Sequence, residues 1–448
     1  MPDSEEIEII EYAEAMNRWS ANERDLGCIS LTKDSIFFGV ARSLGPVPGQ
    51  VQNAMSKIDL CVHGEIQGSG HDSAGLGTII TLTDVALALK LILQYAPQVT
   101  HVAVASFGPF VRLGKYNREN NPDEYGRFPK HLTNYPEWSG ESLYQRSRTI
   151  LADILNVTLK ELEIEILVCL DVNVSALGEH YFELDRLFDK DEEGKKLLHN
   201  TFSLAGSRVP SRIRQTDMRK WNDVAHWYQR WSRTTTAYVK ISHSVNVGFT
   251  DVGWIGRGRH HAQMNAHLPR KLSFDGQIDD FPGSCSIHGD CLEGLVSVHA
   301  LSTRIRTHED PKLRNDEFLQ FAKIGDPIWD IAAAYVADFC HLITKFIAPR
   351  RIAIGGLISR GPNGTEQGKR YFLTLVRNHF EQRLKPANST RNIPAYEELE
   401  DLTKFITYRI CPWPGVFGGL IVARWDKTNL TPVGTFEHNL VERNRGDP

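Results

Sequence analysis

The chain has 448 residues, of which 41% are hydrophobic and 24% charged, and its formal net charge is −4. This length suits two domains, the composition is ordinary for a globular protein, and the charge gives no electrostatic case for binding nucleic acid or an anionic membrane. The acidic N-terminus has no apolar signal core, no apolar run reaches about 18 residues, and the seven cysteines lack small-scaffold spacing, so we expect a cytoplasmic protein.

The first predicted element is a helix at residues 4–19, where apolar side chains recur at helical spacing. We expect this N-terminal extension, residues 1–25, to cover a surface or an oligomer contact, with a homodimer as the assembly it would serve. Further along, the sequence predicts strands at residues 58–62 and 101–107 and a helix at residues 82–95, for which Thr81 or Thr83 is the N-cap.

The rest of the chain continues to alternate between strand and helix. Helices are predicted at residues 143–155, 328–347 and 370–384, and strands at residues 163–170, 238–250 (a pair), 351–358 and 405–410. Pro327 opens the long second helix, because proline suits a first helical turn. This alternation predicts an α/β fold.

A long polar insert interrupts the pattern at residues 180–235. It carries Trp221, Trp227, Tyr228 and Trp231, and this aromatic content argues against a fully disordered loop. We therefore predict a lid or a partner surface here, with a floppy loop as the alternative.

Two thiols and an imidazole lie close together in Cys285, His288 and Cys291. Thiolates and imidazole at this spacing suit a tetrahedral zinc ion, which needs a fourth ligand. Three histidines lie upstream, at positions 260, 261 and 267, and we choose His267. The alternative is one or two buried cysteines beside a surface histidine, because free cysteine packs as a small hydrophobe.

Five sequence segments, taken in order, resemble one family. They are VASFGPF at 104–110, DVNVSALGE at 171–179, DFPGSCSIHGDCLEGL from position 280, GDPIWDIAAAYVADF at 325–339 and RIAIGGLIS at 351–359. Together they resemble the ROK family of sugar kinases (repressors, open reading frames and kinases), and within it the fructokinase-like branch that contains zinc. The resemblance runs from about residue 26 to about residue 425.

This resemblance implies a fold and a domain plan. The fold is the actin-like ATPase (ribonuclease H-like) fold, with two α/β domains around a central cleft that takes a small-molecule ligand. We predict an N-terminal domain at residues 26–170, a C-terminal domain at residues 171–430 with a zinc loop at residues 260–293, and a tail at residues 431–448. The zinc would be structural, because four protein ligands leave no open coordination position.

Asp171 follows an apolar strand, where a carboxylate points into the crevice in which α/β folds bind ligands. The resemblance implies that it is the general base that takes the proton of the attacking sugar hydroxyl. The alternative is that Asp171 is the N-cap of a helix that starts near Asn173. We also expect Asn173, Glu293 and His243 to bind the substrate, although the family's second sugar-contacting glutamate is replaced by Met264.

The two phosphate-binding loops depart from the family pattern. The G-G-T-K turn of the family corresponds here to residues 30–36, which contain no glycine and add Asp34, and the second glycine-rich loop keeps only Gly248. Backbone N–H groups approach phosphates closely where glycine is present. The nucleoside side is better kept, and the candidate cofactor-binding residues are Gly355, Gly356, Gly418 and Gly419, with ordinary turns as the alternative.

From these departures we predict an enzyme that has lost phosphoryl transfer. It would use Asp171 as an acid or base, with His243 as a second group, for dehydration, isomerisation or cyclisation of a small molecule. The first alternative is an ATP-dependent hexose kinase that uses Mg-ATP, with fructose as the substrate of that family branch. The second alternative is a non-catalytic sugar-binding pseudokinase.

Overall fold

The computed structural model describes residues 21–43, 58–71, 78–108, 110, 115–130, 138–190, 235–251, 254–255, 267–274, 276–285, 287–306, 322–384 and 401–427. The predicted N-terminal helix, the C-terminal tail, His260, His261, Met264 and the part of the insert at residues 191–234 lie outside these ranges. Among the helices described, none combines the length and the apolar character needed to cross a bilayer.

The first sheet combines an antiparallel meander with two parallel strands. Its strands are β1 (Leu26–Leu31), β2 (Ser35–Ser43), β3 (Ile58–Gln67), β6 (His101–Ser106) and β7 (Glu165–Leu170). They lie in the order β3-β2-β1-β6-β7, in which β1, β2 and β3 are antiparallel neighbours and β6 and β7 run parallel to β1.

The second sheet repeats this plan. Its strands are β8 (Thr236–Ile241), β9 (Val245–Asp251), β10 (Trp254–Ile255), β13 (Arg351–Gly355) and β14 (Ile406–Tyr408). The order is β10-β9-β8-β13-β14, again a meander followed by two parallel strands. Two sheets with the same order and strand directions are the mark of the actin-like ATPase fold, so the predicted fold class is confirmed. Two short hairpins, β4–β5 (Gly70–His71, Thr78–Ile79) and β11–β12 (Ser273–Phe274, Gln277–Ile278), lie outside the sheets.

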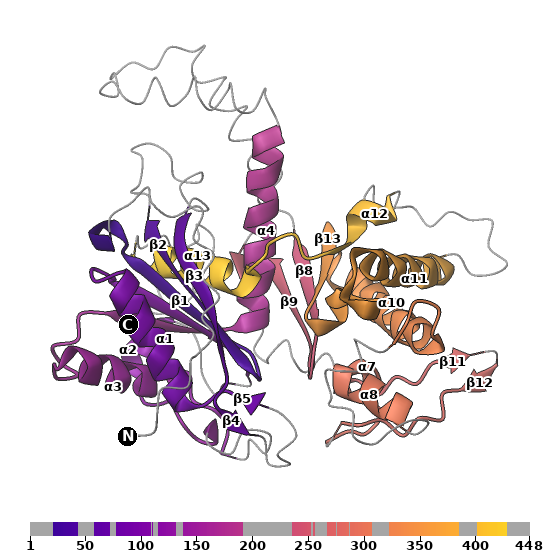
Figure 1. Cartoon of the computed structure of the whole chain (residues 1–448), viewed down its shortest axis with the longest axis horizontal. Coiled ribbons are helices and arrows are strands. Elements are labelled where there is room, and N and C mark those ends of the chain that lie inside the picture. The colour runs from indigo at the N-terminus through magenta and orange to yellow at the C-terminus, as the bar shows by residue number, and fades with distance from the viewer. Residues whose placement is uncertain are drawn as a thin grey trace, which may run out of the picture.

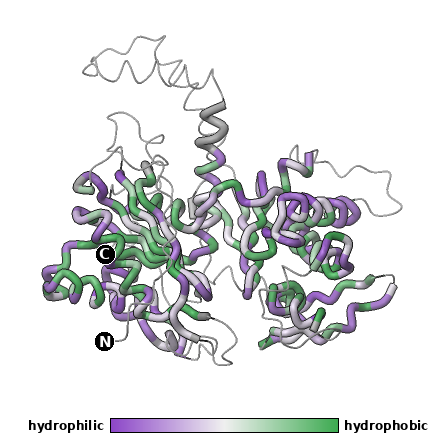
Figure 2. Tube along the Cα trace, in the orientation of Figure 1, coloured by the Kyte–Doolittle hydropathy of each residue, from purple (hydrophilic) through white to green (hydrophobic). Residues whose placement is uncertain are grey.

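Helices cover both faces of each sheet (Figure 1). On the first sheet, α1 (Leu82–Tyr95) and α3 (Leu143–Leu155) cover one face and α13 (Pro414–Lys427) the other. Between α13 and the second sheet lies α4 (Asp171–Lys190), and α10 (Pro327–Ile347) and α11 (Glu366–Leu384) pack beyond that sheet. Shorter helices are α2 (Lys115–Asn120), α7 (Leu292–Val296), α8 (Val298–Arg306) and α12 (Leu402–Phe405). Figure 2 shows hydrophobic residues along the first sheet, whereas α11 is largely hydrophilic.

Two predicted boundaries need correction. The helix α13 packs on β1 and β6, so it completes the N-terminal layer although the sequence placed residues 171–430 together. The helix α4 continues to Lys190, past the predicted start of the insert at residue 180. Tyr181 explains part of this extension, because it is buried and packs edge-on against Trp425 of α13.

Candidate functional site

Four side chains of the predicted metal site converge. The candidate ligand atoms of His267, Cys285, His288 and Cys291 all lie within 4.8 Å of one another. The Sγ atoms of Cys285 and Cys291 lie 3.8 and 3.6 Å from Nδ1 of His267. Zinc–sulfur and zinc–nitrogen bonds in a tetrahedron separate S and N by about 3.6 Å, so the spacing fits such an ion. Burial and then the charge of His288 lower the pKa of His267, which favours the neutral imidazole that binds metal.

Glycines let the backbone around these ligands fold tightly. Cys285 and Gly289 exchange backbone hydrogen bonds, and Gly289 has a φ of 62°, which favours glycine. A Cβ on Gly294 would lie 1.8 Å from the carbonyl oxygen of Gly289. The N–H of Leu292 donates to the carbonyl of Leu268 at 3.2 Å, which brings the residue after His267 to the residue after Cys291.

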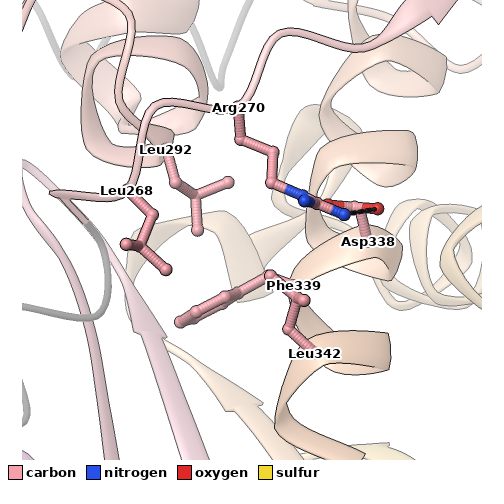
Figure 3. Close-up of a pocket in the computed structure, with 6 residues that line it drawn as sticks. All are labelled: Leu268, Arg270, Leu292, Asp338, Phe339 and Leu342. Atoms are coloured by element: carbon pink, nitrogen blue, oxygen red, sulfur yellow. Dashed lines mark hydrogen bonds and ion pairs between the residues drawn. The ribbon is translucent and has the colours of Figure 1, made fainter. Parts of the chain in front are cut away.

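The metal loop is anchored on α10 beside a small pocket (Figure 3). The pocket is lined by Leu268, Arg270, Leu292, Asp338, Phe339 and Leu342. Arg270 forms an ion pair with the buried carboxylate of Asp338, which also accepts from Arg383 at 3.2 Å. Although burial opposes it, Arg270 and then Arg383 lower the pKa of Asp338, so the loop is held to α10 by a charged contact as well as by apolar packing.

Asp171 begins α4 immediately after β7, at the carboxyl end of that strand. Its side chain is 4% exposed, and its Oδ2 lies 2.5 Å from Nζ of Lys240 on β8. The predicted open position in a cleft is therefore corrected, because the carboxylate is buried and ion-paired. The contact joins the start of α4, directly after β7, to β8 of the second sheet, and sequence reasoning missed Lys240.

The two hairpin turns that the sequence resemblance aligned with phosphate-binding loops lie close together. Asp34 lies in the β1–β2 turn and His243 in the β8–β9 turn, and Nε2 of His243 lies 3.6 Å from Oδ2 of Asp34. Thr32 also donates its hydroxyl to Asp34 at 2.9 Å. Burial alone would raise the pKa of Asp34, but the hydrogen bond and charge of His243, with the bond from Thr32, lower it to about 2. The β1–β2 and β8–β9 turns thus meet through the contact between Asp34 and His243.

Two other predicted substrate residues lie on elements that contact this region. Asn173 is buried in the first turn of α4, where Gly248 of β9 comes so close that a Cβ on it would lie 2.2 Å from the carbonyl oxygen of Val172. The glycine left in the second loop therefore serves helix–strand packing. Glu293 of α7 accepts the N–H of Val245 at 3.2 Å. Burial raises the pKa of Glu293.

The four predicted nucleotide glycines occupy packing positions. A Cβ on Gly355 would lie 2.0 Å from the hydroxyl of Tyr238, and Gly356 has a φ of 84° beside the β8–β9 turn. Gly418 and Gly419 lie within helix α13, so the alternative of an ordinary turn is wrong for these two. Gly418 faces the backbone of α4, and Gly419 faces β1.

The repeated sheets and the residues between them define a two-domain α/β protein of the actin-like ATPase fold. Residues 227–393, which include all four candidate metal ligands, match the profile of the ROK family. The chain therefore contains a ROK-family segment, and the predicted resemblance is confirmed.

Three curated relatives are fructokinases. The chain is 27% identical to that of Lactococcus lactis over 144 residues, 27% to that of Pediococcus pentosaceus over 188 residues, and 29% to that of Zymomonas mobilis over 147 residues. The alignments cover 32%, 42% and 33% of this chain and 45%, 54% and 45% of the relatives, so the chain spans about half the length of the relatives it matches. Among solved structures, a ROK hexokinase from Thermus thermophilus aligns with a TM-score of 0.49 at 14% identity, over 90% of this chain and 99% of that one.

Proposed function

We propose that the protein is an ATP-dependent sugar kinase of the fructokinase type. The observation that carries this proposal is the position of Asp171, which lies at the carboxyl end of β7 with a lysine from the second sheet beside it. The relatives are named fructokinases, which favours this function over the loss of phosphoryl transfer that the altered loops predicted. Nothing in the described site supports dehydration, isomerisation or cyclisation.

In the proposed reaction, a sugar hydroxyl oxygen attacks the γ-phosphorus of Mg-ATP, the bond to the β-phosphate oxygen breaks, and ADP leaves. Asp171 accepts the hydroxyl proton, because it lies directly after β7 at the carboxyl end of that strand, where α/β folds bind ligands. Phosphoryl transfer depends on positioning and on charge more than on covalent help from the protein. We assign Glu293 and Asn173 to binding of the sugar. Glu293 is partly buried on α7, Asn173 is buried on α4, and both helices pack against β9.

We also propose that the four-residue cluster binds a structural zinc ion. The two S–N separations of 3.6 and 3.8 Å support this, as do two thiols and two imidazoles, the donor set that zinc prefers. Cys291 directly precedes α7, so a bound ion would fix the start of the helix that carries Glu293. The ion would shape the sugar side of the site without taking part in the reaction.

The test is sugar-dependent ADP formation by the wild-type protein and by Asp171→Asn, with fructose, glucose and mannose as candidate sugars. We expect turnover with one or more sugars and a fall in kcat of at least about 100-fold in the variant. Metal content and circular dichroism serve as folding controls.

Full activity in Asp171→Asn would end the assignment of the base. Sugar binding by the wild-type protein without any turnover would favour the pseudokinase alternative. Altered melting temperature with unchanged activity would mean that Asp171 serves only the start of the helix.

A further inference from the structure

The reaction proposed above assigns no role to the charged side chain of Lys240. It lies near the end of β8, its side chain is 18% exposed, and its ammonium group lies 2.5 Å from the carboxylate of Asp171. A largely buried ion pair is weak evidence for stability, because removing both charges from water costs about as much as their attraction returns. A lysine on the proposed base therefore needs a chemical explanation.

The position of Lys240 supplies one. The strand β8 leads directly into the β8–β9 turn, whose His243 pairs with Asp34 of the opposite turn. Neither turn presents a run of glycines through which backbone N–H groups could hold phosphates. Side-chain cations can take over that task, because a lysine ammonium is a compact charge that binds phosphate oxygens.

We propose that Lys240 is a catalytic residue that binds the terminal phosphoryl group of ATP. In the structure its ammonium group lies on Asp171. When ATP and sugar are bound, the ammonium moves to an oxygen of the transferred phosphoryl group and stays protonated throughout, so Asp171 is released to accept the hydroxyl proton. Pairing of Asp34 with His243 offsets a carboxylate that would otherwise repel the same phosphates. This inference rests on the proposed kinase function.

The experiment compares wild type with Lys240→Met, Lys240→Gln and Lys240→Arg. The matched control is Lys427→Met, which removes an ion pair of the same 2.5 Å length with Asp25, at the end of β1 opposite the β1–β2 turn. Two readouts are needed: kcat for sugar phosphorylation, and the ratio of affinities for a non-hydrolysable ATP analogue and for ADP, measured by calorimetry. Lys240→Gln carries the test if the methionine variant does not fold, because glutamine can still donate to Asp171 without the charge.

We expect Lys240→Met and Lys240→Gln to lower kcat at least 100-fold and to reduce the preference for the ATP analogue over ADP to about one. Lys240→Arg should keep part of both, and Lys427→Met should change neither. If the pair between Lys240 and Asp171 serves only the fold, the Lys240 variants will differ from wild type in melting temperature and keep the same preference for the ATP analogue over ADP.

The inference and the proposed function fail in different ways. Wild-type turnover together with a Lys240→Met kcat within threefold of wild type would overturn the role of Lys240 and leave the kinase function standing. A wild-type protein without sugar-dependent turnover would contradict the kinase function. Equal wild-type affinity for the ATP analogue and for ADP would overturn the role of Lys240 in either case.

Discussion

The carboxylate of Asp34 connects the β1–β2 turn to the β8–β9 turn through its contact with His243. Burial opposes ionisation, but His243 and Thr32 lower its pKa to about 2. The pKa in the unfolded chain is about 3.9, so this pairing adds stability above about pH 4 that is lost as the pH falls through about 2. The side chain is 37% exposed, so solvent screening reduces the contribution to about 1 kcal/mol.

We therefore expect Asp34→Asn to lower the free energy of unfolding by about 1 kcal/mol at pH 7. The difference from wild type, measured by denaturant titration at several pH values, should shrink steadily below about pH 4. Asp153→Asn, at an exposed position on α3, is the control and should cause little change. A wild-type-to-variant difference that stays constant between pH 7 and pH 2.5 would contradict the pairing with His243.

Single residues were predictable where their chemistry is local in sequence. Three of the candidate metal ligands lie within a short segment, and the fold brings them together with the fourth as their spacing predicts. The ion pair between Asp171 and Lys240 was not predictable, because the two residues are 69 positions apart and lie on different elements, α4 and β8. A lysine within a predicted strand does not indicate from sequence which carboxylate it will pair with.

The contact between α4 and α13 is the element-scale feature most open to test. A Cβ on Gly418 would lie 1.7 Å from the carbonyl oxygen of Val174, and one on Gly178 would lie 2.2 Å from that of Pro414. Both obstacles are backbone atoms within packed helices, which cannot turn aside as a flexible side chain can. The helices cross closely because each presents a glycine to the other.

We expect Gly418→Ala to lower the free energy of unfolding by about 1–3 kcal/mol, as overpacking does, and to leave the content of the proposed zinc unchanged. Gln382→Ala, on the exposed side of α11, is the control and should stay within about 0.5 kcal/mol of wild type. If Gly418→Ala binds Mg-ATP more weakly but is as stable as wild type, the packing role is contradicted and Gly418 belongs to the nucleotide site.

Elements were predictable where periodicity and end signals agree. The helix predicted at residues 82–95 is α1, and Thr81 caps it by accepting the N–H of Asp84. The strands β1 and β2 were not predicted, because β1 is buried at every position and so lacks the alternation that marks a half-exposed strand. The docking of α13 on the first sheet was also not predictable, because local pattern carries no information on which sheet a helix covers.

At the scale of the whole molecule, the segment that carries the candidate metal ligands, residues 267–291, packs against α10 through Leu268 and Arg270. Cys285→Ser should remove the proposed zinc and lower the melting temperature by roughly 10 °C, because a structural ion contributes directly to folding. Cys340→Ser is the control, since this buried thiol on α10 lies outside the cluster and its loss should leave the metal content unchanged. Elemental analysis and thermal melts measure both effects.

Less than about a tenth of an equivalent of zinc in wild-type protein purified without chelator would contradict the site. Retention of a full equivalent by Cys285→Ser would instead mean that the ion binds elsewhere.

The family resemblance predicted the overall architecture well, because several short motifs occur in the family's order. The cytoplasmic location and the homodimer stay predictions. The activity stays a proposal, because the missing loop glycines argue for lost phosphoryl transfer, whereas Lys240 and His243 bring nitrogen-bearing side chains to the same region.

The most direct test of the kinase function is phosphorus NMR of the wild-type protein incubated with Mg-ATP and fructose. We predict that the γ-phosphate resonance of ATP falls while resonances of ADP and of a sugar phosphomonoester rise in equal amounts. Unchanged ATP, or inorganic phosphate as the product in place of a phosphomonoester, with fructose, glucose and mannose alike, would contradict the proposed function.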